Sequence, residues 1–129
     1  MGFYGMVSVW FGVSESFQNL EEYVDIGYTK YGDAIDSKFG TNFEFGYYDE
    51  DNIEICFNED PQNNIEDILS DFSYSEQFIP RIKELINGES LSHDINSVIV
   101  LYNFKYSEVK SEDKSKNIEM KFIGTVPYE

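Results

Sequence analysis

Carboxylates and aromatic rings are concentrated in one stretch of the chain, between Phe43 and Asp60. The stretch reads FEFGYYDEDNIEICFNED and holds seven acidic and five aromatic residues, with no Lys or Arg. Carboxylates can coordinate a metal, act as an acid–base pair or bind a basic partner. Aromatic side chains set among charges are typical of protein interfaces. These chemistries make different demands on residue type and spacing, so the sequence can be tested for each.

Residues that could serve catalysis are few. His93 is the only histidine and lies in a polar segment beside Asp94. The GxSxG, HExxH, GxGxxG and P-loop motifs are absent. Cys56, the only cysteine, lies among apolar and acidic residues, which raise the pKa of a thiol. We predict no catalytic residue and no enzyme; a hydrolase that uses two carboxylates on a glycoside remains the enzymatic alternative, because sequence spacing does not give the distance between them.

The run Asp49 to Asn52 has the oxygen-rich composition of a calcium loop. An EF-hand needs an oxygen ligand at its fifth position and a glycine at its sixth, where this chain has Ile53 and Glu54. A single histidine also excludes a multi-histidine zinc site. We therefore expect no metal site and no cofactor.

The charge of the chain is strongly negative and unevenly distributed. Its 25 acidic and 9 basic residues give a net charge of −16, and residues 39–80 contain eleven of the acids and no base. Such a charge disfavours direct binding to nucleic acid and to anionic membranes. No signal peptide or membrane-spanning run is found, and a single cysteine cannot form an internal disulfide. We expect a cytoplasmic protein that binds neither nucleic acid nor a membrane.

The apolar pattern predicts the elements that position the acidic stretch. Strands are expected over 6–12, 52–58, 95–104 and 117–124, with 105–116 as a hairpin loop and Pro61 at the end of the second strand region. Helices are expected from a Ser14 cap to residue 22 or 24, over 65–69, and from a capping box at Ser73 to a stop at Gly88. The predicted fold class is α+β: a single domain over 1–129, with a mixed or mainly antiparallel sheet of about four to five strands and two to three helices packed on it.

Alternation in the second strand suggests one continuous binding surface. Ile53, Ile55 and Phe57 would face the core, which leaves Glu54 on an acidic outer face beside the loop with the tyrosines. Tyrosine is a frequent hot-spot residue in interfaces. A solvated face that only keeps the protein soluble is the simpler alternative. The predicted partner-binding residues are Tyr47, Tyr48, Asp49, Glu50, Asp51, Glu54, Glu59 and Asp60.

Four segments resemble the immunity protein 22 family of bacterial polymorphic toxin systems. They are VSVWFGVSESFQNLEEYV (7–24), FGYYDEDNIEICF (45–57), DFSYSEQFIPRIKEL (71–85) and VIVLYNFKY (98–106). The positions that match the family pattern are Trp10, Gly12, Tyr48, Asp49, Asp51, Glu54, Ser73, Ser75 and Phe78. The resemblance implies a non-enzymatic protein that binds and blocks a cognate toxin, with Trp10, Gly12 and Phe78 serving the fold and Tyr48, Asp49, Asp51 and Glu54 serving binding.

Composition and resemblance together favour an immunity protein that binds and neutralises a cognate bacterial toxin. An acidic, tyrosine-containing surface complements a cognate toxin with a basic surface. The alternative is an acidic nucleic-acid mimic or regulator that binds a basic host protein, because such a protein would show the same charge.

Overall fold

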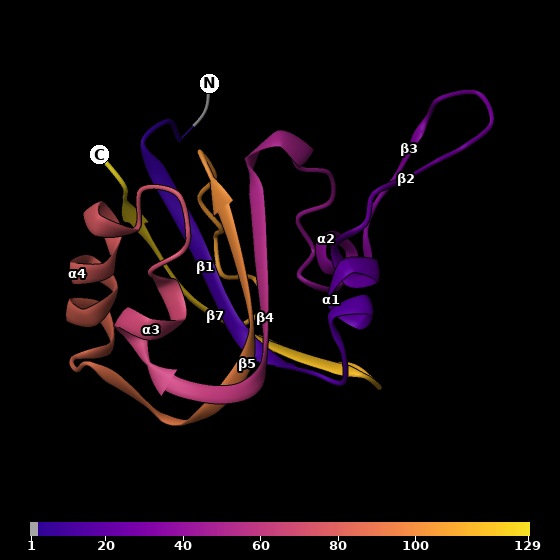
Figure 1. Cartoon of the computed structure of the whole chain (residues 1–129). Coiled ribbons are helices and arrows are strands. Elements are labelled where there is room, and N and C mark those ends of the chain that lie inside the picture. The colour runs from indigo at the N-terminus through magenta and orange to yellow at the C-terminus, as the bar shows by residue number, and fades with distance from the viewer. Residues whose placement is uncertain (1–2) are drawn as a thin grey trace.

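A five-stranded antiparallel sheet forms the centre of the computed structural model, which describes residues 3–129 (Figure 1). Its strands follow the order β4-β5-β1-β7-β6. Their bounds are β1 Met6–Ser14, β4 Ile53–Asn64, β5 Ser90–Tyr102, β6 Glu112–Lys114 and β7 Ile118–Pro127. Two further strands, β2 Gly27–Tyr28 and β3 Ala34–Ile35, pair only with each other in a hairpin that projects from the body (Figure 1). The predicted α+β class is confirmed.

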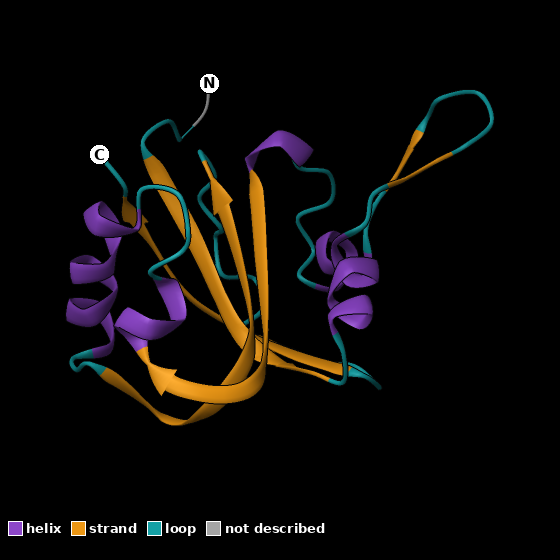
Figure 2. Cartoon of the chain, viewed as in Figure 1, coloured by secondary structure: helices purple, strands orange, loops and turns teal. Residues whose placement is uncertain are grey.

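Helices cover both faces of the sheet (Figure 2). Helices α1 Phe17–Val24 and α2 Lys38–Asn42 lie on one face, and α3 Ile65–Leu69 and α4 Ser75–Ile86 lie on the other. A 3-10 turn, η1 Glu50–Asn52, precedes β4. Within residues 3–129 the structure thus has four α-helices, one more than the two to three that were expected. The additional helix is α2, whose five residues include Gly40 and carry little helical signal.

Strand β5 is buried on both faces, as its continuous apolar run predicts. Val98, Val100 and Tyr102 belong to the core under α3 and α4, whereas Ile99 and Leu101 belong to the core under α1 and α2. A strand between two helical layers has no solvent side, so it needs apolar residues at successive positions. The alternation of Ile118, Met120 and Phe122 in β7 is also confirmed, because all three side chains enter the α1–α2 core.

The core under α1 and α2 is built from aromatic rings around Trp10, which is fully buried. The Trp10 ring lies 4.8 Å from that of Phe39 in an edge-to-face arrangement and 5.2 Å from that of Phe122. Phe43 and Phe45 approach Trp10 at 6.0 and 6.2 Å. Edge-to-face contacts at such distances add to the stabilisation from burial. The 17% aromatic content therefore serves the fold first.

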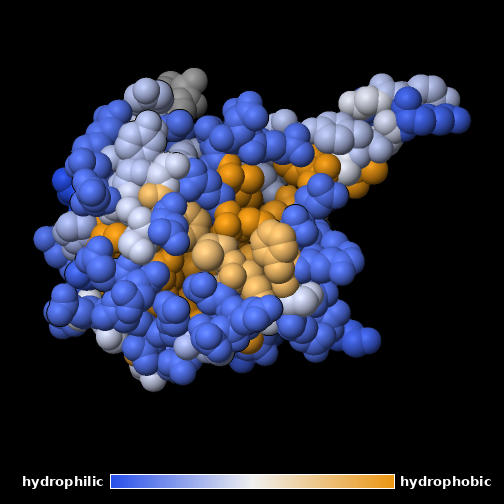
Figure 3. Space-filling model, in the orientation of Figure 1, coloured by the Kyte–Doolittle hydropathy of each residue, from blue (hydrophilic) through white to orange (hydrophobic). Residues whose placement is uncertain are grey.

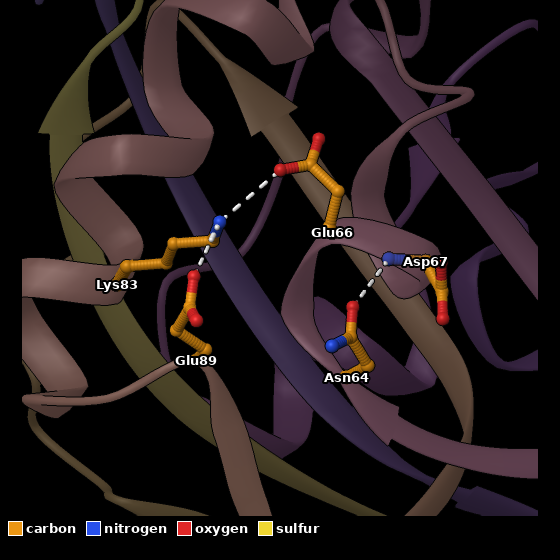
Figure 4. Close-up of polar contacts among 5 residues, drawn as sticks. All are labelled: Asn64, Glu66, Asp67, Lys83 and Glu89. Atoms are coloured by element: carbon orange, nitrogen blue, oxygen red, sulfur yellow. Dashed lines mark hydrogen bonds and ion pairs between the residues drawn. The ribbon is translucent and has the colours of Figure 1, made fainter.

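In the other helical layer, polar contacts cap α3 and join it to α4. Asn64 caps α3 by accepting a 3.0 Å hydrogen bond from the backbone N–H of Asp67. Lys83 on α4 forms ion pairs with Glu66 on α3 at 3.1 Å and with Glu89 at 3.2 Å (Figure 4). Such partly exposed ion pairs contribute about 0–1 kcal/mol each, so burial of the apolar faces of α3 and α4 is the main source of stability here.

The predicted hairpin between the last two long strands is wrong. Strand β1 lies between β5 and β7 and pairs antiparallel with both, with Val9 opposite Val100 on one side and Gly124 on the other. Strand β7 pairs with β6 on its other side, where Asp113 lies opposite Met120. The segment 105–116 therefore crosses over one end of β1 instead of making a tight turn. The N-terminal strand competes for the same pairing positions, and a local pattern does not reveal that.

Two further boundaries differ from expectation around β4. Pro61 does not end the strand, because β4 continues to Asn64 through an irregular pairing with β5 after Phe57. An edge strand tolerates proline because its outer N–H groups need no partner. The capping box at Ser73 does not form, since Tyr74 occupies the cap of α4 in a left-handed conformation without a side-chain hydrogen bond.

The helix ends are displaced by one or two residues. Ser16, not Ser14, caps α1 by accepting a hydrogen bond from the N–H of Asn19. Ser14 instead ends β1 and contacts the Ser97 hydroxyl at 2.7 Å. Helix α4 ends at Ile86, where Asn87 adopts the left-handed conformation one residue before the predicted Gly88. Displacements of one or two residues are usual at helix ends, where the last turn frays.

Candidate functional site

Strand β4 is an edge of the sheet, because β5 is its only neighbour among the described strands. Ile53, Ile55 and Phe57 direct their side chains to the α1–α2 core, and Cys56 packs against the α3–α4 core. All four are only partly buried. We call residues 53–57 the β4 edge. Figure 3 shows apolar residues exposed over the middle of this side of the molecule, with hydrophilic residues around them.

The two tyrosines before this edge have different environments. The Tyr47 side chain is 55% exposed, whereas Tyr48 is 3% exposed and its hydroxyl donates a hydrogen bond to the Val24 carbonyl. The expectation that both tyrosines lie on one surface is therefore wrong for Tyr48. Its ring packs 5.8 Å from that of Phe39, in the aromatic core. Burial raises the pKa of Tyr48 to about 12.

The acids that follow Tyr48 form the turn into β4. Asp49 caps η1 by accepting a 2.9 Å hydrogen bond from the N–H of Asp51. Glu50 accepts a 2.6 Å hydrogen bond from the hydroxyl of Tyr28, on the β2–β3 hairpin. This hydrogen bond is the main reason that the pKa of Tyr28 is raised to about 12. Asp51 is exposed and makes no side-chain hydrogen bond among the described residues.

Glu54 is held by the loop between α3 and α4. Its carboxylate accepts hydrogen bonds of 3.0 Å from the Ser73 N–H and 2.6 Å from the Ser73 hydroxyl. The Tyr102 hydroxyl lies 3.3 Å from the same carboxylate and donates to the Ser73 carbonyl at 2.5 Å. The outer face predicted for Glu54 is thus partly covered, and its carboxylate ties β4 to the loop before α4.

Glu59 and Asp60 lie apart from the other predicted residues. Both are exposed and follow Phe57, in the irregular part of β4. The extended chain from Ile53 to Glu59 spans up to roughly 20 Å. The structure therefore brings together Tyr47, Glu50 and Asp51 at one end of β4 and places Glu59 and Asp60 towards the other.

A shallow groove lies on each side of the β4 edge. The α1 groove has Ile53 and Ile55 in its floor and the acids Glu21, Glu22, Asp25 and Glu50 around it. The Cys56 groove contains Cys56 and Phe72, with Glu54 and Asp71 as its acids. The predicted site lacked Glu21, Glu22 and Asp25, which lie far from β4 in the sequence, and Asp71, which lies in the base-free run 39–80 but outside the stretch 43–60. The excess of acids in 15–25 hints at the first three, and the absence of bases from 39–80 hints at Asp71.

The acids around the two grooves have no basic partners among residues 3–129. Among residues 3–129, the ion pairs join Lys83 to Glu66 and Glu89, and Lys114 to Glu112. Five of the nine bases fall in 105–121, around β6 and β7 at the opposite edge of the sheet. The negative charge of the β4 side is therefore not neutralised within the described chain.

The geometry of residues 3–129 gives no support to metal binding or to catalysis by His93 or Cys56. Within residues 3–129, no three His, Cys, Asp or Glu residues are placed to hold a metal ion. His93 is exposed on β5 and contacts the Ser92 hydroxyl at 3.0 Å. Burial, followed by the charge of Asp71, raises the pKa of the Cys56 thiol. In the same part of the chain, no helix combines the length and apolarity needed to cross a bilayer.

Comparison with known families identifies the chain. The model of a family described as immunity protein 22 matches residues 7–129. The chain belongs to the immunity protein 22 family. The match extends to β6 and β7, which lie beyond the last of the four segments that show the resemblance. No curated protein and no solved structure matches the chain. Membership implies the role of an immunity protein, whose partner is a toxin.

Proposed function

We propose that the protein neutralises a cognate toxin by binding a basic face of that toxin at the β4 edge. Within the described residues, the observation that carries the proposal is an edge strand with partly exposed apolar residues and a border of carboxylates without ion pairs. An apolar centre with a charged rim is the usual composition of a protein interface. Membership in the immunity protein 22 family supports a toxin as the partner.

The negative charge acts mainly on the rate and selectivity of association. Like charges in 39–80 repel one another and lower stability, a cost offset when a basic partner binds. Complementary charge accelerates encounter and disfavours partners of the wrong sign, while buried anchor residues contribute most of the affinity. Tyr47 is an exposed aromatic residue in the segment before β4 and is assigned the anchor role.

The test is co-expression with a candidate cognate toxin, combined with titration calorimetry of the purified pair. Wild-type protein is expected to restore growth and to bind with a submicromolar Kd. The variant Glu21→Lys/Asp51→Lys is expected to lose protection, because it reverses two charges beside the β4 edge. The fold should be retained, because both positions are exposed and neither side chain makes a hydrogen bond in the described chain.

The matched control is Glu84→Lys/Glu119→Lys, which alters exposed acids on α4 and β7. Each substitution adds two charges, so both double variants change the net charge from −16 to −12. Equal protection by the two folded double variants would refute the assignment of the surface. Salt-sensitive binding to many unrelated basic proteins, without protection, would favour the nucleic-acid mimic instead.

A further inference from the structure

We infer that the toxin docks by adding an extended strand to the β4 edge, so that the sheet continues from this protein into its partner. The inference rests on the proposed function and specifies how the same surface binds. The added segment is a basic strand, with Lys or Arg side chains that enter both grooves beside β4. Three features of the described chain lead to this conclusion: the unguarded edge, the paired grooves and the sign of the charge.

Within residues 53–57, the β4 edge has few of the devices that normally keep edge strands from pairing, since its one charged side chain, Glu54, is held by Ser73. In an antiparallel edge strand, every second residue directs its N–H and C=O away from the neighbouring strand. Soluble proteins usually protect such groups with charged side chains, especially lysines, or with prolines, bulges or a covering segment. Residues 53–57 are IEICF, paired in regular register with β5 from Leu101 to Ser97, and the irregularity and Pro61 come only after Phe57.

The opposite edge of the sheet shows the contrast. There β6 has only three residues, Glu112 to Lys114, and it is flanked by lysines. Its central residue, Asp113, is buried and accepts hydrogen bonds from Tyr23 at 2.6 Å and from Asn42 at 2.9 Å. A short, charged strand with an inward carboxylate is poorly suited to strand addition. The same sheet thus has one protected edge and one open edge.

The grooves accommodate the side chains of an added strand. Successive side chains of a strand point to opposite faces of a sheet. On one face they would enter the α1 groove, over Ile55 and towards Glu21 and Asp25; on the other they would enter the Cys56 groove, over Phe72 and towards Asp71. Lys and Arg suit both grooves, because their aliphatic stems cover apolar surface while the charged heads reach carboxylates.

The negative charge around the β4 edge indicates which kind of strand binds there. A second copy of this chain would place one acidic border against another, since residues 39–80 contain eleven acids and no base. Pairing of two β4 edges is disfavoured by that repulsion. A basic strand of the toxin relieves it, and main-chain hydrogen bonds then supply affinity that does not depend on side-chain identity.

The experiment uses the full chain and the toxin domain that it suppresses in co-expression. Amide hydrogen exchange, followed by NMR, first identifies which residues of 53–57 exchange fast in the free protein and therefore point outward. The expected result is that these amides exchange at least 100-fold more slowly in the complex. Substitution of an outward residue by Pro is expected to weaken binding at least 10-fold more than substitution by Ala, because only Pro removes the outward donor.

Cys56 supplies an independent footprint, since it is the only cysteine and lines one groove. Its reaction with N-ethylmaleimide is expected to slow at least 10-fold in the complex. The control is Cys56→Ser/Ser107→Cys, which moves the thiol to an exposed position in the segment before β6 and is expected to react at the same rate free and bound.

The outcomes separate this inference from the proposed function. Tight binding and protection, with outward amides that still exchange fast and with Pro and Ala variants of equal affinity, would overturn strand addition and leave the proposed function intact. Slow outward exchange in the free protein together with a dimeric mass would also overturn it, because a second copy would then occupy the edge. Failure of the wild-type protein to bind or suppress the toxin would overturn both.

Discussion

The Glu54 carboxylate and Ser73 form a two-point contact that joins the edge strand to the loop before α4. Oε1 accepts from the Ser73 N–H at 3.0 Å and Oε2 accepts from its hydroxyl at 2.6 Å. Glu54 was expected to bind the partner, yet in the described chain it has this structural role. Its position beside the Cys56 groove means that the contact also shapes the proposed surface.

Loss of the Glu54 carboxylate should therefore lower stability. Glu54→Ala is expected to reduce the free energy of unfolding by about 1–2 kcal/mol, because charge-assisted hydrogen bonds to a partly exposed group are lost. Asp51→Ala, at an exposed position without a side-chain hydrogen bond, should change it by less than about 0.5 kcal/mol. Urea unfolding followed by fluorescence of Trp10, the only tryptophan, provides the measurement. Equal effects of the two variants would show that the contact contributes nothing.

Substitutions of Tyr47 and Tyr48 should distinguish a residue that binds the toxin from one that stabilises the fold. Tyr47→Ala removes a side chain that is 55% exposed, so the free energy of unfolding should change by less than about 0.5 kcal/mol. Its effect on the toxin Kd is expected to be about 10-fold or more, as for an aromatic anchor. Tyr48→Ala empties a site in the aromatic core and should cost about 3–5 kcal/mol of stability. Calorimetry and urea unfolding of both variants test the contrast, which would fail if Tyr47→Ala bound as tightly as wild type.

Gly12 marks a position where β1 and β7 come unusually close. A Cβ atom at Gly12 would lie 1.9 Å from the backbone carbonyl oxygen of Glu119, so the strands would have to separate. Gly12→Ala is expected to lower the free energy of unfolding by about 3 kcal/mol or more. A Cβ atom at Gly88 would have its nearest neighbour 3.9 Å away, and Gly88→Ala should have little effect. Similar unfolding midpoints for the two variants would contradict the close approach.

Buried tyrosines should make the protein sensitive to alkali. Burial raises the pKa of Tyr48 to about 12, and it also raises those of Tyr23 and Tyr102, with added contributions from Asp113 and Glu54 respectively. An unfolded tyrosine has a pKa of about 10, so above pH 10 the unfolded state releases protons that the folded state retains. Stability is thus complete below pH 10 and falls as pH rises from 10 towards 12, by up to about 1.4 kcal/mol per pH unit for each tyrosine.

The alkaline effect can be assigned to one residue. Tyr48→Phe removes one of the titrating groups, so its free energy of unfolding should fall less steeply between pH 10 and 11 than that of the wild type. Tyr31→Phe, at a position that is 80% exposed, is the control and should retain the wild-type slope. Urea unfolding at pH 8, 9, 10 and 11 provides the comparison. Identical slopes for all three proteins would show that Tyr48 does not titrate differently in the folded state.

The sequence by itself determined the properties that depend on local pattern. Alternation in 53–57 and 118–122 predicted which side chains enter the core, because a strand repeats every two residues. The continuous apolar run in 98–102 predicted a strand buried on both faces. The absence of bases from 39–80 predicted where negative charge would be concentrated. The four segments shared with the immunity protein 22 family predicted the family, which the match over residues 7–129 confirms.

Only the tertiary structure decided which of these segments become neighbours. Strand β1 separates β5 from β7 and leaves β4 at an edge, because pairing depends on competition among strands far apart in the sequence. The same packing buries Tyr48 against Phe39 and exposes Tyr47, although both follow Gly46 in one aromatic run. It also brings α1 and the loop before α4 to the two sides of β4. A periodic pattern records whether a side chain is covered, whereas the fold as a whole determines what covers it.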